Sequence, residues 1–130
     1  LLWRNYSFDV IPLEFISSIY EEFVTRKDRK KKRKTGTIYT PPHLVDFILD
    51  VVLPWNGTDW NLKILDPACG SGIFLVKAFQ RLVWRWKASE ERKPDAKDLK
   101  RLLTKNLFGV DQDEHAVRVA SFSLYLAMCD

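Results

Sequence analysis

The chain has 130 residues, of which 46% are hydrophobic and 29% charged, so it is large enough for one modest domain and too apolar for a wholly disordered chain. Its formal net charge is +4. Residues 26–34 (RKDRKKKRK) hold eight basic residues and one acidic residue, and the rest of the chain together carries −3. Such a block is typical both of nucleic-acid binders and of solvated, flexible linkers, so composition leaves both interpretations open.

Cys69 and Cys129 are the two cysteines, and neither belongs to a Cys-x-x-Cys pair or a histidine cluster. The sequence therefore predicts no metal site. Two free thiols fit a reducing, cytoplasmic compartment, and we expect a prokaryotic intracellular protein. The sequence contains no secretory signal and no apolar run of about 18 residues, so no membrane span is expected. Because the chain begins at Leu1 without an initiator methionine, we expect it to be part of a longer protein.

Two helices are predicted in the first half of the chain. Residues 13–25 place apolar side chains at helical spacing, and the basic block follows as a linker. The second helix is expected to begin with Thr40 as its N-cap and Pro41 in its first position, and to end before Pro54. The side chains expected to face the core are Leu13, Ile16, Ile19, Tyr20 and Phe23 in the first helix and Leu44, Phe47, Ile48, Val51 and Val52 in the second.

The hydrophobic period then changes. Residues 62–66 (LKILD) form a short apolar run that ends in an acid, and residues 67–72 (PACGSG) follow as a tight, glycine-rich turn. Residues 73–86 are predicted to be helical, and strand, turn and helix in this order open a βαβ unit. The predicted inner face of this helix is Leu75, Phe79, Val83 and Trp86.

The remaining residues predict a helix, a second strand and a last helix. Pro94 and Asp95 can start a helix that carries Ala96, Leu99, Leu102 and Leu103 and stops near Asn106. Residues 107–111 (LFGVD) form the second strand, again ending in an acid, and Asp113 can cap the last helix. The predicted inner residues of that helix are Ala116, Val117, Ala120, Leu124, Ala127 and Met128.

The glycine-rich turn is the first candidate site. Gly70 and Gly72 lack a Cβ, so a ligand could approach the backbone closely, and the turn could present N–H groups of a helix start. Asp66 adds a carboxylate at the end of the strand. A purely structural turn is the alternative, because a Gly-x-Gly pattern alone is weak evidence.

Two further segments are candidates. Asp111 ends the second strand, where doubly wound folds bind ribose hydroxyls, although an acid there can also cap a helix. It follows Asp66 by 45 residues, against about 20 in a compact dinucleotide fingerprint, and the intervening helix accounts for the excess as an insertion. This spacing disfavours a nicotinamide-dependent oxidoreductase. Residues 37–42 (TIYTPP) offer a capped helix start that suits a ligand carboxylate, with ordinary capping as the simpler interpretation.

Together, GTIYTPP, ILDPACGSGIFL and NLFGVDQDEHAV resemble the motifs of adenine-N6 DNA methyltransferases, above all the modification subunits and fused enzymes of restriction–modification systems, over residues 8–130. The resemblance implies an α/β, Rossmann-like class I S-adenosylmethionine-dependent methyltransferase fold. It also implies a helical segment with a basic linker over 1–34 and a partial cofactor-binding domain over 35–130. The implied cofactor is S-adenosylmethionine.

The family motifs also imply a role for each matching residue. Tyr39 and Thr40 would contact the methionine end of the cofactor, Asp111 its ribose hydroxyls, and Gln112 would lie beside its adenine. The glycine-rich turn would hold the cofactor through Asp66, Pro67, Ala68, Gly70, Ser71 and Gly72.

The catalytic segment of the family, Asn/Asp-Pro-Pro-aromatic, does not occur in the sequence, since Pro41 and Pro42 belong to the upstream motif. We therefore assign no catalytic residue and expect this chain alone to be inactive, whereas the parent enzyme would methylate the exocyclic amine of a flipped adenine. The implied partners are DNA and specificity or restriction subunits. The side chains expected on the DNA backbone are Lys30, Lys31, Lys32 and Arg33.

Two other functions stay open from the sequence. A basic nucleic-acid-binding module without a cofactor would explain residues 26–34, but it would leave the glycine-rich heptapeptide without a role. A methyltransferase of the same fold that acts on protein or RNA is the other alternative.

Overall fold

The computed structural model describes residues 15, 16, 19, 20, 22 and 40–129. The first five of these are helical and fall within the helix predicted over 13–25, whose other residues lie outside the described part. The predicted boundary between residues 34 and 35 and the basic block also lie outside it. The elements that follow are α3 (Pro42–Val52), β1 (Ile64–Asp66), α4 (Ile73–Glu90), α5 (Ala96–Asn106), β2 (Leu107–Gly109) and α6 (Glu114–Cys129).

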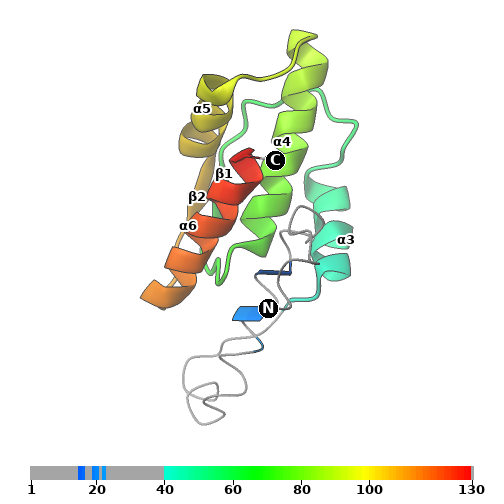
Figure 1. Cartoon of the computed structure of the whole chain (residues 1–130). Coiled ribbons are helices and arrows are strands. Elements are labelled where there is room, and N and C mark those ends of the chain that lie inside the picture. The colour runs from blue at the N-terminus through cyan, green and yellow to red at the C-terminus, as the bar shows by residue number, and fades with distance from the viewer. Residues whose placement is uncertain (1–14, 17–18, 21, 23–39, 130) are drawn as a thin grey trace, which may run out of the picture.

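β1 and β2 form a two-stranded parallel sheet, as the strand–turn–helix pattern predicted. Ile64 pairs with Leu107, and Asp66 pairs with Gly109. α4 packs against both strands and against α3, α5 and α6. In Figure 1 it lies at the centre, with α3 on one side and α5 and α6 on the other. The chain is therefore a mixed α/β structure built around α4.

Because it has neighbours on several sides, α4 is buried around most of its circumference. Of its four predicted core residues, Val83 is only half-buried and the other three are buried. The side chains that the single predicted stripe missed include Ile73, Val76, Ala78 and Leu82. A helix surrounded in this way cannot be recognised from one apolar stripe.

The predicted start of α3 was wrong by one residue. The helix begins at Pro42, and its N-cap is Pro41, which provides no side-chain cap. Pro41 has ψ 141°, an extended conformation. The reason is steric, because the ring of Pro42 pushes the residue before it out of helical geometry.

The predicted buried face of α3 was also wrong. The helix buries Val45 and Leu49, with Leu53 following, and these side chains join the core around α4. The five side chains of the predicted stripe are all exposed, from 37% for Ile48 to 73% for Val51. Ion pairs from α3 to α4 account for the difference, because they hold a polar side of α3 close to α4.

Those ion pairs centre on Arg81, whose side chain is fully buried although it sits in the middle of α4. Its guanidinium lies 2.7 Å from the Asp50 carboxylate and donates to the carbonyl of Leu53 at 3.0 Å. It also lies 4.9 Å from the centre of the Trp55 ring. Lys77, one turn earlier, pairs with Asp46 at 3.0 Å. Arg81 thus binds the C-terminal end of α3, where carbonyls lack helical partners.

A second buried arginine continues this arrangement. Arg85 donates to the carbonyl of Pro54 at 3.1 Å and to that of Asp59 at 2.8 Å. It fixes the loop that leads from α3 to β1. The sequence did not predict either arginine as buried, because arginine in a helix is ordinarily solvated.

The predicted start of α5 is confirmed by its cap. Asp95 accepts hydrogen bonds from the backbone N–H groups of Lys97 and Asp98 at 2.8 and 2.9 Å, and the Asp98 side chain accepts one from the N–H of Asp95 at 3.0 Å. This is a capping box. The helix ends at Asn106, as predicted, and the Asn106 side chain donates to the carbonyl of Leu62 at 2.7 Å.

The predicted start of α6 is confirmed as well. Asp113 accepts from the N–H of His115 at 2.9 Å. Of the predicted inner residues, Ala116 and Ala120 are buried and the other four are half-buried, while the buried Ser123 was missed. Within the described part of the chain, no helix combines the length and the hydropathy needed to cross a membrane.

Candidate functional site

The loops that follow β1 and β2 meet at the carboxyl edge of the sheet. The N–H of Val110 donates to the carbonyl of Asp66 at 2.9 Å, and the N–H of Cys69 donates to the carbonyl of Val110 at 2.9 Å. These bonds continue the pairing of the strands beyond their ends. The glycine-rich turn and the loop that carries Asp111 are therefore side by side.

The Asp111 carboxylate links these two loops directly. One oxygen, Oδ2, accepts from the backbone N–H of Gly70 at 2.8 Å, across 41 residues of sequence. The other oxygen, Oδ1, accepts from the N–H of Asp113 at 2.8 Å. The sequence analysis connected Asp111 with the turn only through the cofactor that the family resemblance implies, and it missed that Asp111 holds the turn. A pattern of residue types contains no signal for a bond to a backbone N–H so far away.

Asp66 provides the second carboxylate of the site. Its Oδ1 accepts from the N–H of Ala68 at 3.1 Å and so closes the first bend of the turn. Burial raises the pKa of Asp66, the hydrogen bond from Ala68 opposes that rise, and the negative charge of Asp111 adds to it. The two acids are close enough to influence one another, so this edge of the sheet has a negative potential that favours a cationic ligand.

The expectation that the turn presents free N–H groups to a ligand is wrong for four of its residues. The N–H groups of Ala68, Cys69 and Gly70 are bonded to the partners described above, and that of Gly72 donates to the carbonyl of Cys69 at 2.8 Å. These four donors hold the shape of the turn. The carbonyl oxygens of Asp66, Cys69 and Val110 are engaged in the same way. The carboxylates of Asp66 and Asp111 have further lone pairs, which can accept hydrogen bonds from a ligand.

Gly70 and Gly72 both have left-handed backbone angles, with φ of 51° and 89°. At Gly72 the missing side chain makes room for another helix. A Cβ there would lie 2.7 Å from the Cβ of Ala120 on α6 and 2.9 Å from its Cα. The missing side chain of Gly72 is therefore needed for the contact with α6, and its role in cofactor binding stays a prediction.

The other predicted site residues lie in or next to the same loops. Ser71 is buried, Pro67 and Ala68 are exposed, and Gln112 is exposed beside Asp111. Thr40 is half-buried immediately before the start of α3. The predicted residues outside the described part are Tyr39, Lys30, Lys31, Lys32 and Arg33.

Cys69 is buried within the turn. Burial raises the pKa of its thiol, and the negative charges of Asp66 and Asp111 raise it further. A thiol that stays protonated is a poor nucleophile, so Cys69 is a packing residue of the turn. Among the described residues, no group of three or more His, Cys, Asp or Glu side chains could hold a metal ion.

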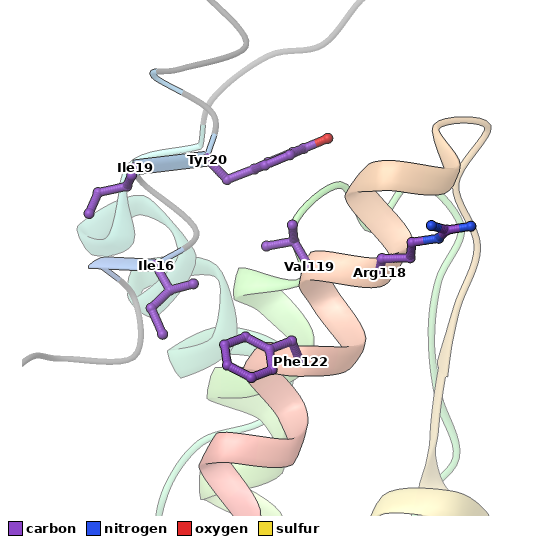
Figure 2. Close-up of a pocket in the computed structure, with 6 residues that line it drawn as sticks. All are labelled: Ile16, Ile19, Tyr20, Arg118, Val119 and Phe122. Carbon is purple, nitrogen blue, oxygen red and sulfur yellow. The ribbon is translucent and has the colours of Figure 1, made fainter.

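A hollow of about 480 Å³ lies between α6 and the described helical residues near the N-terminus. In Figure 2, Ile16 points toward Phe122, Tyr20 extends over Val119, and Arg118 points away from these side chains. Arg118 is paired with Glu114 of its own helix. The lining is mainly hydrophobic, so this hollow suits apolar packing better than a charged ligand.

Comparison with known proteins shows which sequences this chain is similar to. The sequence model of the N-6 DNA Methylase family matches residues 13–130. The chain is 32% identical over 117 residues to the adenine-specific methyltransferase PglX of Streptomyces coelicolor, a match that covers 87% of this chain and 9% of that protein. It is also 32% identical over 108 residues to the methylase subunit of the type I restriction enzyme MjaIX of Methanocaldococcus jannaschii, covering 83% of this chain and 16% of the subunit.

A third relative is a fused enzyme. The chain is 27% identical over 158 residues to the type II restriction enzyme and methyltransferase RM.Eco57I of Escherichia coli, covering 97% of this chain and 16% of that protein. The chain thus spans between 9 and 16% of the length of these three relatives.

Proposed function

Since the chain belongs to the N-6 DNA methylase family, we propose that it is the S-adenosylmethionine-binding part of an adenine-specific DNA methyltransferase of a restriction–modification system. One observation carries the proposal: Asp66 and Asp111, from the ends of two parallel strands, meet at a glycine-rich turn. Ligands of open α/β sheets bind at this carboxyl edge.

The groups at this edge fit the cofactor. S-adenosylmethionine has a positively charged sulfonium and ammonium group and two ribose hydroxyls, so it supplies positive charge and hydrogen-bond donors. The site supplies two carboxylates, and four N–H groups of the turn are already used internally. Donors of the ligand therefore meet acceptors of the protein at this edge, while the start of α3 is the proposed position of the ligand carboxylate.

We assign each end of the cofactor to one part of the site. Asp111 accepts from the ribose hydroxyls, Gln112 lies beside the adenine, and Tyr39 and Thr40 contact the methionine end. The glycine-rich turn contacts the cofactor through Asp66, Pro67, Ala68, Gly70, Ser71 and Gly72. When bound, the cofactor supplies a reactive methyl group, and these residues orient it and exclude water around it.

In the whole protein we propose a class I methyltransferase fold, of which residues 35–130 form the first part after a helical segment over 1–34. The open face of the sheet supports this. Leu65 and Phe108 are paired neighbours on that face, and both are exposed together with Val110. Because parallel sheets are ordinarily covered on both faces, this apolar face is expected to pack against further parts of the enzyme.

The reaction itself belongs to the whole enzyme in this proposal. The parent enzyme transfers the methyl group to the exocyclic amine of an adenine flipped out of the DNA helix. Lys30, Lys31, Lys32 and Arg33 contact the phosphate backbone, which contributes affinity without sequence preference. Specificity or restriction subunits are its candidate protein partners. The chain alone lacks the Asn/Asp-Pro-Pro-aromatic segment and is expected not to transfer the methyl group.

The proposal is tested by calorimetric titration of the 130-residue chain with S-adenosylmethionine. Asp111→Ala is expected to weaken binding by about 1–3 kcal/mol, because ligand hydroxyls then lose a charged acceptor. Asp113→Ala is the control, since this neighbouring acid caps its own helix and contacts neither Gly70 nor the proposed ribose position. A wild-type chain that does not bind the cofactor would refute the proposal, and so would equal affinities of wild type and Asp111→Ala.

A further inference from the structure

The Asp111 carboxylate is engaged before any ligand is present. Each of its oxygens accepts one backbone N–H, from Gly70 at 2.8 Å and from Asp113 at 2.8 Å. A side chain whose only task was to bind ribose would not need these bonds. They connect the turn after β1 with the loop after β2.

The bond to Gly70 acts at the point of the turn that most needs support. Gly70 has φ 51°, a left-handed conformation. In a free chain, glycine has many alternatives to this conformation, so a bond that holds Gly70 in place restricts the turn strongly. The two backbone hydrogen bonds between the loops join Val110 to Asp66 and to Cys69. Neither of them includes Gly70, the next residue of the turn. Hydrogen bonds from N–H groups to an ionised carboxylate are about twice as strong as those between neutral groups.

From this geometry we infer that Asp111 is a positioning residue as well as a ligand-binding one: it holds the glycine-rich turn in its binding conformation before the cofactor arrives. This inference rests on the proposed function for the identity of the ligand. A carboxylate has about four lone-pair sites, so two remain for the ribose hydroxyls after both backbone bonds are made. A site that is already ordered loses less conformational entropy when it binds.

An asparagine at position 111 tests this division of roles. Its side-chain oxygen can accept from one loop, but its NH₂ group would face the N–H of the other loop, so one of the two bonds is lost. Asp113→Asn is the matched control, because it removes the same charge two residues away. Among the described residues, the Asp113 side chain accepts a hydrogen bond only from the N–H of His115.

The first readout needs no ligand and no variant. In the wild-type chain, we expect an NMR scalar coupling across the hydrogen bond between the Gly70 nitrogen and the Asp111 carboxyl carbon. Its absence in a folded chain would overturn the inference. In Asp111→Ala, which removes both acceptors, the Gly70 amide should exchange with solvent about tenfold faster or more. Amides of α4 should keep their wild-type rates, and so should all amides of Asp113→Asn. Unchanged exchange at Gly70 would contradict the inference.

The second readout separates positioning from direct ribose contact. S-adenosylhomocysteine and its 2′,3′-dideoxyribose analogue are titrated against wild type and Asp111→Asn. If Asp111 acts through the turn, the substitution weakens the analogue about threefold or more, even though the analogue has no hydroxyls to bind. An unchanged affinity for the analogue, with weakened binding of the parent compound, would show a ribose contact alone. Failure of the proposed function looks different, because the wild type would then bind neither compound while the Gly70 measurements stand by themselves.

Discussion

Ala120 on α6 lies so close to Gly72 that a Cβ added to Gly72 would be 2.7 Å from the Cβ of Ala120. The glycine that ends the turn is thus also the point where α6 approaches the start of α4. This contact joins the second βα unit to the first at the base of the site. Its consequences for stability can be measured separately from ligand binding.

Gly72→Ala is expected to destabilise the chain by about 2–4 kcal/mol, because a left-handed backbone angle and an overpacked helix contact act together. Urea unfolding measures the free energy. The double variant Gly72→Ala/Ala120→Gly removes the closer of the two contacts, the one at 2.7 Å, and should recover part of the loss, since the Ala120 Cα stays 2.9 Å from the added Cβ. If Ala120→Gly gave no recovery in the Gly72→Ala background, the close approach of α6 would not be the cause.

Arg81→Met tests the buried link between α3 and α4. Methionine keeps much of the apolar length but leaves the carbonyl of Leu53 without its donor and breaks the ion pair with Asp50. We expect a loss of about 2–4 kcal/mol in the free energy of unfolding.

Arg118→Met is the control for this prediction. Arg118 forms an exposed pair with Glu114 within one helix, and such pairs contribute about 0.5 kcal/mol or less. Thermal unfolding of the two variants should differ by several degrees in midpoint. Equal midpoints would show that the buried arginine contributes no more than a surface one.

Asp66→Asn is expected to stabilise the chain at neutral pH while weakening cofactor binding. Burial, and then the charge of Asp111, raise the pKa of Asp66 in the folded state, so its ionised form costs stability at pH 7. The stabilising contribution of a raised acid pKa is complete below the unfolded pKa of about 4 and is lost as pH rises through the folded pKa. Asparagine avoids this loss and can still accept from Ala68.

The measurement is urea unfolding of Asp66→Asn over a pH series. Its advantage over wild type should be largest near pH 7 and should shrink as the pH falls toward the ordinary carboxyl range. Asp59→Asn is a matched control, because the Asp59 side chain makes the same type of bond, to the N–H of Asn61, in an exposed loop. A stability advantage of Asp66→Asn that grows toward acid pH would contradict a raised pKa of Asp66.

The two cysteines should differ in reactivity. Burial raises the pKa of the Cys69 thiol, and Asp66 and Asp111 add to the effect, whereas Cys129 is exposed. With iodoacetamide at pH 8, Cys129 should be modified about tenfold faster or more, and denaturant should abolish the difference. Peptide mass spectrometry follows each site. Comparable rates in the folded chain would mean that the turn opens readily.

Sequence reasoning succeeded where the signal is local. Asp95 and Asp113 cap helices through bonds that span two or three residues, so their residue types predict them. The two acidic strand ends were also found, because parallel strands that end in acids bring those acids to one edge. In each case the deciding contact lies within one element or follows from strand direction.

Sequence reasoning failed where a residue far away in the sequence determines the local structure. α3 is apolar on several sides, and its stripe predicted the wrong buried face because Arg81 and Lys77 draw Asp46 and Asp50 toward α4. A signal for this exists: two acids four residues apart on one helix match two bases four residues apart on another. The bond between Gly70 and Asp111 has no such signal, since its donor is a backbone N–H.

The central claim, that the loops after β1 and β2 form the S-adenosylmethionine site, is tested most directly by mapping amide chemical shifts of the 130-residue chain during titration with the cofactor. The account predicts saturable shifts concentrated in residues 66–72 and 110–113, with α5 unaffected. It also predicts that Asp113→Asn keeps this pattern and that Asp111→Asn weakens it. Shifts centred on the hollow between Ile16 and Phe122, or no saturable shifts at all, would contradict it.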